Sequence, residues 1–166
     1  DDRYQKRISA LDEMNTNGLS ADGQLDCKSL RAATEIELHE MEERDWRFRN
    51  PAQYVPVNAI YQLLIYPIDE VHKAVKHRMQ QIPEYLRGAR AQLSQYPELA
   101  VPVWSQMAID ECRSSVSLFR DLARHPLINK QFTNPAILQP LFVDPAHALA
   151  DFAKFLESDI RPKAAG

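Results

Sequence analysis

One short segment of this sequence comes close to a metal-binding motif. Residues 39–43 read His-Glu-Met-Glu-Glu, whereas a zincin motif has histidines at its first and fifth positions. Histidines four residues apart on a helix can bind one metal ion together, and the glutamate beside the first serves as general base. In this chain Glu43 stands where the second histidine would be.

Glu35, His39 and Glu43 follow one another at four-residue spacing, so a helix places them on one face. A carboxylate can bind zinc, but the sequence nominates no further ligand to complete a site. The alternative is a solvated face on which Glu43 forms an ion pair with Arg47, one turn further on. We therefore assign no catalytic, cofactor-binding or metal-binding residue in this chain, and expect no cofactor.

Two other histidines lie in a locally basic segment. His72 and His77 are five residues apart, which is about 140° around a helix, so one metal ion cannot easily bind both. Lys73, Lys76 and Arg78 surround them. The segment is interpreted as a polar helix face, with a surface for a protein partner as the alternative.

A third candidate is a cluster of aromatic side chains around an Asn-Pro pair, made by Trp46, Phe48, Asn50, Pro51 and Tyr54. Such a cluster can line a ligand pocket. It can equally anchor a turn to the core, because large aromatic rings contribute much of the buried apolar area of a domain.

Composition limits the class of protein that carries these residues. The chain has 166 residues, 45% hydrophobic and 26% charged, with a net charge of −3, so it lacks the basic footprint of a nucleic-acid-binding protein. No apolar run approaches the roughly 18 residues of a membrane span. The first residues resemble neither a signal nor a transit peptide, which fits a cytoplasmic protein and equally an exported one after signal removal.

Four glycines and eleven prolines point to helices separated by proline-containing connections. Few glycines leave few hairpin turns, and proline is tolerated in the first turn of a helix. No alternating strand pattern of useful length is present. The predicted fold is all-α, a bundle-like array of helices without a sheet, in one domain over residues 1–166.

The clearest helical periodicity predicts one buried seam, made by Val71, Val75, Met79, Ile82, Leu86, Ala89 and Leu93. Pro83 falls inside it, so we expect either a kink or two helices that meet near Ile82. Leu86, in the middle of the seam, is expected to be buried.

Weaker patterns predict the remaining elements. Residues 4–11 form a short helix. Ser20 or Asp22 caps a longer helix that ends near Asp45, with Leu30, Ala33, Ile36 and Met41 on its apolar side. Residues 54–66 form an apolar helix buried on most sides. Residues 100–124 form another helix, with an apolar stripe made by Val101, Trp104, Ala108, Cys112, Phe119 and Ala123. Residues 125–144 are expected to be a loop with short turns. Asp144-Pro145 then caps a last helix, which buries Leu149, Phe152, Leu156 and Ile160.

Cys27 and Cys112 are far apart in the sequence. Two cysteines can form one disulfide, but the preferred interpretation is two small buried hydrophobic residues.

Three stretches together resemble the bacterial domain-of-unknown-function family 885. They are residues 46–54 (WRFRNPAQY), residues 78–93 (RMQQIPEYLRGARAQL) and residues 152–166 (FAKFLESDIRPKAAG). The likeness covers residues 45–166, and Ile-Pro-Glu-Tyr-Leu at residues 82–86 is its most specific part. Residues 1–44 match only as a generic helical lead-in.

The resemblance implies a parent protein like the helical gluzincin-type metallopeptidases, which carry His-Glu-x-x-His in their C-terminal half. This chain contains no such motif, so no catalytic or zinc-binding residue is transferred to it. It would be the non-catalytic, N-terminal helical part of a longer zinc-dependent peptidase, exported or lipid-anchored, and form one wall of the substrate cleft. Its partners would be the missing C-terminal half and a peptide substrate. The alternative is a free-standing helical module that binds another protein.

Overall fold

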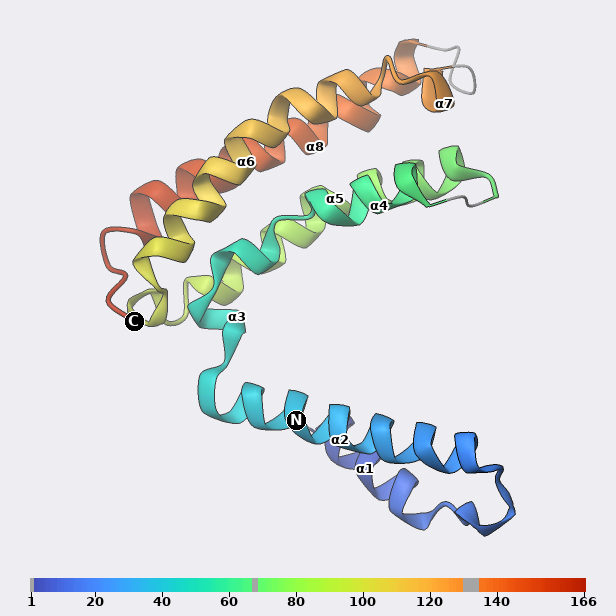
Figure 1. Cartoon of the computed structure of the whole chain (residues 1–166). Helices are drawn as coiled ribbons and strands as arrows, with labels where there is room; N and C mark the ends of the chain where they lie inside the picture. Colours follow the sequence, from blue (N-terminus) through green and yellow to red (C-terminus); the bar gives the residue numbers. More distant parts are fainter. Residues whose placement is uncertain (1, 67–68, 130–134) are drawn as a thin grey trace. The chain divides into compact units, whose positions relative to one another are not determined.

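Every regular element in the described part of the chain is a helix, which confirms the predicted all-α class (Figure 1). The computed structural model describes residues 2–66, 69–129 and 135–166, and these ranges contain no strand. The elements are α1 (Asp2–Glu13), η1 (Thr16–Gly18), α2 (Ala21–Arg44), α3 (Trp46–Arg49), η2 (Pro51–Tyr54), α4 (Val57–Ile65), α5 (Val71–Leu93), η3 (Pro97–Leu99), α6 (Pro102–Leu122), α7 (Pro126–Asn129), α8 (Pro135–Phe155) and η4 (Leu156–Ile160).

The chain divides into two compact units, Asp1–Trp46 and Arg47–Gly166. The division falls where the sequence predicts the end of a long helix, near Asp45. Each unit is described by itself below.

Unit 1 is a hairpin of α1 and α2. The Ser20 Oγ atom accepts a hydrogen bond of 3.1 Å from the Gly23 backbone N–H, so Ser20 is the N-cap of α2, one of the two predicted caps. Arg31 on α2 reaches across to α1, where its Nε atom lies 2.8 Å from Asp12 Oδ1. This hydrogen bond to the guanidinium holds the pKa of Asp12 below its usual value.

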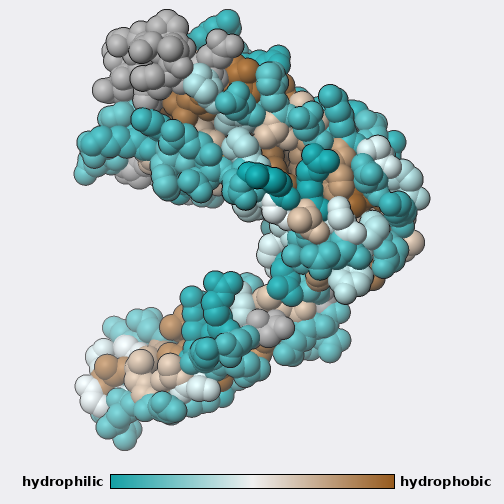
Figure 2. Space-filling view, turned by 180° about the vertical axis from the view of Figure 1, so that it is seen from behind, coloured by the Kyte–Doolittle hydropathy of each residue, from teal (hydrophilic) through white to brown (hydrophobic). Residues whose placement is uncertain are grey.

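The buried face of α2 differs from the predicted one. Thr34 and Leu38 are buried, whereas the predicted core residues Leu30 and Ile36 are 54% and 62% exposed. Thr34 lies on the side of α2 from which Arg31 contacts α1, and Leu38 follows it one turn later. Apolar side chains are therefore visible at the surface of the hairpin (Figure 2, lower part). The sequence offers apolar residues on several sides of α2, and packing against α1 selects one of them.

Unit 2 has α6 and α8 side by side, with α5 packed on α8 and α4 on α5 (Figure 1). The predicted seam on α5 is confirmed, because every member except the half-buried Val71 is at most 3% exposed. Leu86 is 2% exposed and lies in the core.

The apolar stretch before α5 is less buried than predicted. Residues 54–66 form the end of η2 and then α4, in which Ile60 and Leu63 are buried. Tyr61 and Ile65 are 53% and 55% exposed, so the prediction of a helix buried on most sides is wrong. Only the side of α4 that packs on α5 is covered.

Prolines interrupt the helices of unit 2 less than predicted. α5 runs without a break past Pro83, so the alternative of two helices is wrong. α8 passes through both Pro140 and Pro145, so Asp144-Pro145 is not a helix start, and the predicted loop at 125–144 is helical at Pro126–Asn129 and from Pro135 onward. Residues 130–134 of that loop lie outside the described residues.

Burial explains why α8 continues through its prolines. An interior proline costs a helix about 3 kcal/mol, because one backbone hydrogen bond is lost. Against this, Leu141, Phe142, Ala146 and Leu149 are each at most 4% exposed, and a fully buried large apolar side chain contributes about 1.5–3 kcal/mol. Tertiary packing therefore outweighs the local preference.

The predicted stripe of the last helix is buried, and its end has an unusual form. Leu149, Phe152, Leu156 and Ile160 are at most 1% exposed. The last turn, Leu156–Ile160, is a π-helix, closed by a hydrogen bond of 2.8 Å from the Arg161 N–H to the Leu156 carbonyl oxygen.

Both ends of unit 2 bond to the segment between α5 and α6. The Val101 N–H donates to the Arg49 carbonyl at 2.9 Å. The N–H groups of Ala165 and Gly166 donate to the carbonyls of Glu98 and Ala100, each at 3.2 Å. Gly166 lies so close to Leu99 that a Cβ atom at this position would collide with the Leu99 backbone.

Candidate functional site

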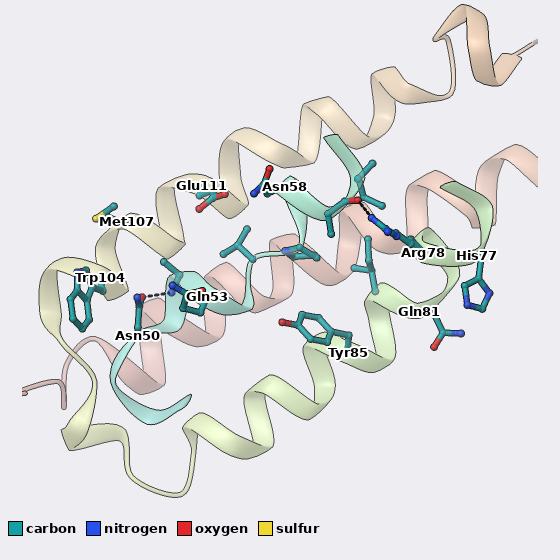
Figure 3. Close-up of a pocket in the computed structure, with 16 residues that line it drawn as sticks. Asn50, Gln53, Asn58, His77, Arg78, Gln81, Tyr85, Trp104, Met107 and Glu111 are labelled. Atoms are coloured by element: carbon teal, nitrogen blue, oxygen red, sulfur yellow. Dashed lines mark hydrogen bonds between the residues drawn. The ribbon is translucent and has the colours of Figure 1, made fainter. Parts of the chain in front are cut away.

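Unit 2 has an open cleft of about 820 Å³ that is lined by three segments of the chain (Figure 3). α5 contributes one wall and α6 the other. The segment from η2 into α4 lies between them. A cleft of this size is in the range that binds small molecules or short peptide segments.

Three large apolar side chains lie on the two walls without being buried. Tyr85 on α5 is 44% exposed, and Trp104 and Met107 on α6 are 38% and 56% exposed. All three border the cleft, Tyr85 from one wall and the others from the opposite wall (Figure 3). Exposed aromatic and methionine side chains gathered at one cavity are typical of recognition surfaces.

Side-chain amides form the polar part of the cleft. Asn50 caps the start of η2, where its Oδ1 atom accepts a hydrogen bond of 3.1 Å from the Ala52 N–H. Gln53, Asn58 and Gln81 also line the cleft, and within the described ranges their amides have no hydrogen-bond partner. Each of these three amides offers two donor hydrogens and one acceptor oxygen to a ligand.

The cleft also carries charges of both signs. Arg78 donates a hydrogen bond from Nη1 to the Ala59 carbonyl oxygen, and neither Arg78 nor His77 has an ion pair within the residues described. Glu111 lies on the opposite wall, where its carboxylate too has no ion-pair partner in the described ranges. Partial burial raises the pKa of Glu111 above its ordinary value.

The predicted aromatic turn anchors the chain and also borders the cleft. Tyr54 is buried, and its hydroxyl donates a hydrogen bond of 2.9 Å to the Arg47 carbonyl. Phe48 packs edge-to-face on Tyr96, with ring centroids 5.0 Å apart. Asn50 alone of the predicted cluster lines the cleft.

The predicted basic segment of α5 is divided between several surroundings. His77 and Arg78 border the cleft, whereas Lys73 forms an ion pair of 2.5 Å with Glu70. Lys76 lines a second cavity of about 570 Å³, to which α5 and α8 both contribute residues. The segment is therefore not one continuous basic surface.

The residues of the incomplete zincin motif do not assemble into a metal site. His39 and Glu43 are exposed on α2, and Glu35 forms an ion pair with Arg31. Nowhere in residues 2–66, 69–129 and 135–166 do three or more His, Cys, Asp or Glu side chains converge as metal ligands. Glu35, His39 and Glu43 therefore form no zinc site within the part of the chain that the structure describes.

Both cysteines are free thiols. Cys112 is completely buried in the core, as predicted for a small hydrophobic residue, and Cys27 is half-buried. Burial, together with the negative charge of Glu111, raises the pKa of the Cys112 thiol to about 12. A thiol with such a pKa stays protonated and is a poor nucleophile.

The cleft residues of α5 and α6 follow helical spacing in the sequence. Trp104, Met107 and Glu111 follow three- and four-residue steps along α6, as Gln81 and Tyr85 do along α5. Such steps mark one helix face. The sequence pattern predicts Trp104 in the apolar stripe of this helix, together with Ala108 and Cys112. Those two are buried, whereas Trp104 is 38% exposed at the cleft. The approach of η2 to α6 has no local signal in the sequence.

No described helix is long and apolar enough to cross a membrane. Comparison with protein-family models, with curated proteins and with solved structures gives no match to this chain.

Proposed function

We propose that unit 2 binds an extended peptide segment in the cleft between α5 and α6 and performs no chemistry itself. In a longer protein of the metallopeptidase-like kind that the sequence resembles, this cleft would be one wall of the substrate site. The zinc ion and the general base would then come from other residues of that protein.

The observation that carries the proposal is the placing of unpartnered amides beside exposed apolar side chains. An extended peptide presents backbone N–H and C=O groups along its length, and Gln53, Asn58 and Gln81 can pair with both kinds of group. Tyr85, Trp104 and Met107 would cover apolar side chains of the same peptide. Binding of this type needs little sequence specificity, as suits a substrate wall.

The proposal can be tested by selecting peptides from a random twelve-residue display library on the whole chain. Peptides that are enriched would be synthesised with a fluorophore on the N-terminus and an amidated C-terminus, and titrated by anisotropy. Gln81→Leu should weaken their binding about tenfold, because two hydrogen bonds worth roughly 1 kcal/mol each are lost with only partial compensation.

Gln80→Leu is the matched control, since Gln80 is the neighbouring exposed residue of α5 and lines the second cavity instead of the cleft. This variant should bind peptides as the wild-type chain does. If no peptide is enriched, or if both substitutions weaken binding equally, the proposed function is wrong.

The second candidate is a helical module that binds a protein partner by itself. It is favoured by the continuous core of unit 2, which joins residues of η2, α4, α5, α6 and α8. The intact mass of the native protein, with its sequence read onward from Gly166, separates the two candidates. A downstream His-Glu-x-x-His motif supports the substrate-wall role, and a chain that stops near Gly166 supports the module.

A further inference from the structure

The second cavity of unit 2 brings two opposite charges to one place without pairing them. Its volume is about 570 Å³, with Lys76 contributed by α5 and Asp144 by α8. Both side chains belong to exposed residues, and neither forms an ion pair with any residue in the described ranges. An ammonium group and a carboxylate are therefore both available to a ligand that enters this cavity.

A backbone carbonyl in the same cavity lacks its normal donor. In an α-helix the carbonyl of one residue accepts a hydrogen bond from the N–H four residues further on. For Leu141 that position is Pro145, which has no N–H to donate, and both residues line the cavity. The cavity therefore borders a point of α8 at which the regular helical hydrogen bond to Leu141 is missing.

Leu141 and Asp144 together make an acceptor pair within one turn of α8. A carboxylate and a carbonyl oxygen are the two groups to which an ammonium ion donates most readily in proteins. On the other wall, Gln80 lines the cavity beside Lys76, and its amide has no hydrogen-bond partner among the described residues. The cavity is therefore lined by two side-chain donors from α5, and by a carboxylate and a carbonyl from α8.

The remaining lining is apolar. It is made by Pro83 and Met79 from α5 and by Pro140, Leu141 and Pro145 from α8. Pro145 and Met79 are buried, while Pro83 is half-buried. A rigid apolar lining of this kind suits the aliphatic side chain of a small ligand.

We propose that this second cavity binds a free amino acid with an aliphatic side chain, and leucine is the probe of choice. The ammonium group of the ligand would donate to the Asp144 carboxylate and to the Leu141 carbonyl. Its carboxylate would accept from Lys76 and Gln80, and its side chain would pack on the proline rings. A small zwitterion is the ligand that neutralises both cavity charges without changing the net charge of the chain.

Binding should be modest, because the cavity is open and both charged side chains are exposed. Ion pairs with exposed groups contribute little, and the ordering of two long side chains opposes them. We expect a dissociation constant on the order of 0.1–1 mM at low salt, rising in about 0.5 M NaCl as the charges are screened.

The measurement is a titration of the ¹⁵N-labelled whole chain with leucine, followed by amide chemical shifts up to about 20 mM ligand. Shifts should saturate at amides of α5 and α8 near Lys76 and Asp144. N-acetylleucine, which lacks the ammonium group, and leucinamide, which lacks the carboxylate, should each bind about three- to fivefold more weakly than leucine.

Two variants assign the two charges to their partners. Lys76→Gln should weaken leucine about three- to fivefold and should not weaken leucinamide, since leucinamide has no carboxylate to lose a contact. Asp144→Asn should likewise weaken leucine and leave N-acetylleucine unchanged. Both positions are exposed, so neither substitution should unfold the chain, which circular dichroism checks.

Matched controls lie on the same two helices. Lys73→Gln and Asp151→Asn remove the same kinds of charge from exposed residues that do not line the cavity. Lys73 forms an ion pair with Glu70, and Asp151 forms one with Lys154. Both control variants should bind leucine as the wild-type chain does. A general effect of net charge would instead appear in the controls and the test variants alike.

Three results would overturn the proposal. The first is the absence of saturable shifts with leucine, which would mean that Lys76 and Asp144 serve only as surface charges. The second is equal binding of leucine, N-acetylleucine and leucinamide, and the third is an equal loss in the control variants. The proposal does not rest on the peptide cleft, because the two cavities share no lining residue.

Discussion

Leu86→Ala tests the core on which both walls of the cleft depend. Leu86 is 2% exposed on α5, next to Tyr85 of the cleft. The substitution removes three carbon atoms, for a transfer term of about 2.4 kcal/mol, and the residual cavity raises the total to about 3–4 kcal/mol. Because leucine and alanine have similar helix propensities, the loss reports packing and not helix formation.

Urea unfolding followed by the fluorescence of Trp104, in a Trp46→Phe background, restricts the measurement to unit 2. Gly88→Ala, half a turn further along α5, is the matched control. An added Cβ meets no other atom there, so alanine should stabilise the helix by about 0.5–1 kcal/mol. A loss below about 1 kcal/mol for Leu86→Ala would refute the assignment of this face to the core.

Two further predictions follow from the pKa shifts of neighbouring residues on α6. In the native protein Ellman's reagent should label Cys27 and leave Cys112 unlabelled, because burial keeps the Cys112 thiol protonated. Denaturation in urea should make Cys112 reactive as well. Labelling of both thiols in native buffer would contradict the burial of Cys112. Glu111→Gln should stabilise unit 2 at neutral pH, because partial burial disfavours the charged carboxylate. The pKa of Glu111 in the folded protein lies above its ordinary value. The gain in stability of Glu111→Gln should therefore be absent at pH values below the ordinary carboxyl pKa. It should grow as the pH rises from the ordinary pKa to the folded-state pKa, and stay constant above the folded-state pKa. Urea melts of both proteins across the acid range measure it, and a difference that grows toward low pH would contradict the reasoning.

The sequence predicts those parts of the fold in which one helix face carries all the apolar residues. On α5 the seam leaves one choice of buried side, and Met79, Ile82 and Leu86 are all buried. α2 shows the opposite case, since Leu30 and Ile36 are as hydrophobic as Leu38 but remain exposed. The choice among faces is made by α1, whose approach is a tertiary event without a local pattern.

The prolines show a second limit. Pro51 and Pro97 each begin a short 3₁₀ helix, as local preference predicts. Pro140 and Pro145 have the same chemistry but lie inside α8, where buried neighbours such as Phe142 compensate for the lost hydrogen bond. The preference of proline for the first turn of a helix therefore predicts helix starts only where the burial of neighbouring apolar side chains does not favour a continuous helix.

The cleft was the hardest feature to predict. Its residues come from η2, α4, α5 and α6, and each of these segments reads as ordinary amphipathic helix or turn. What brings Asn50 and Trp104 to one cavity is the packing of η2 on α6, which depends in part on the bond between Arg49 and Val101. The incomplete zincin motif at His39 lies on α2 and forms no metal site within the described residues.

Backbone hydrogen bonds hold the two ends of unit 2 close together, so the unit is suited to insertion into a loop of another protein. Arg49 is hydrogen-bonded to Val101, and Ala165 and Gly166 are hydrogen-bonded to Glu98 and Ala100. The first and last residues of unit 2 therefore lie side by side. A body with adjacent ends can be placed within a loop of another protein without pulling that loop apart. By the same geometry, unit 2 could be circularly permuted: a short linker would join Gly166 to Arg47, and new termini would be made in the α5–α6 connection. Any continuation past Gly166 would begin beside the point at which unit 2 starts.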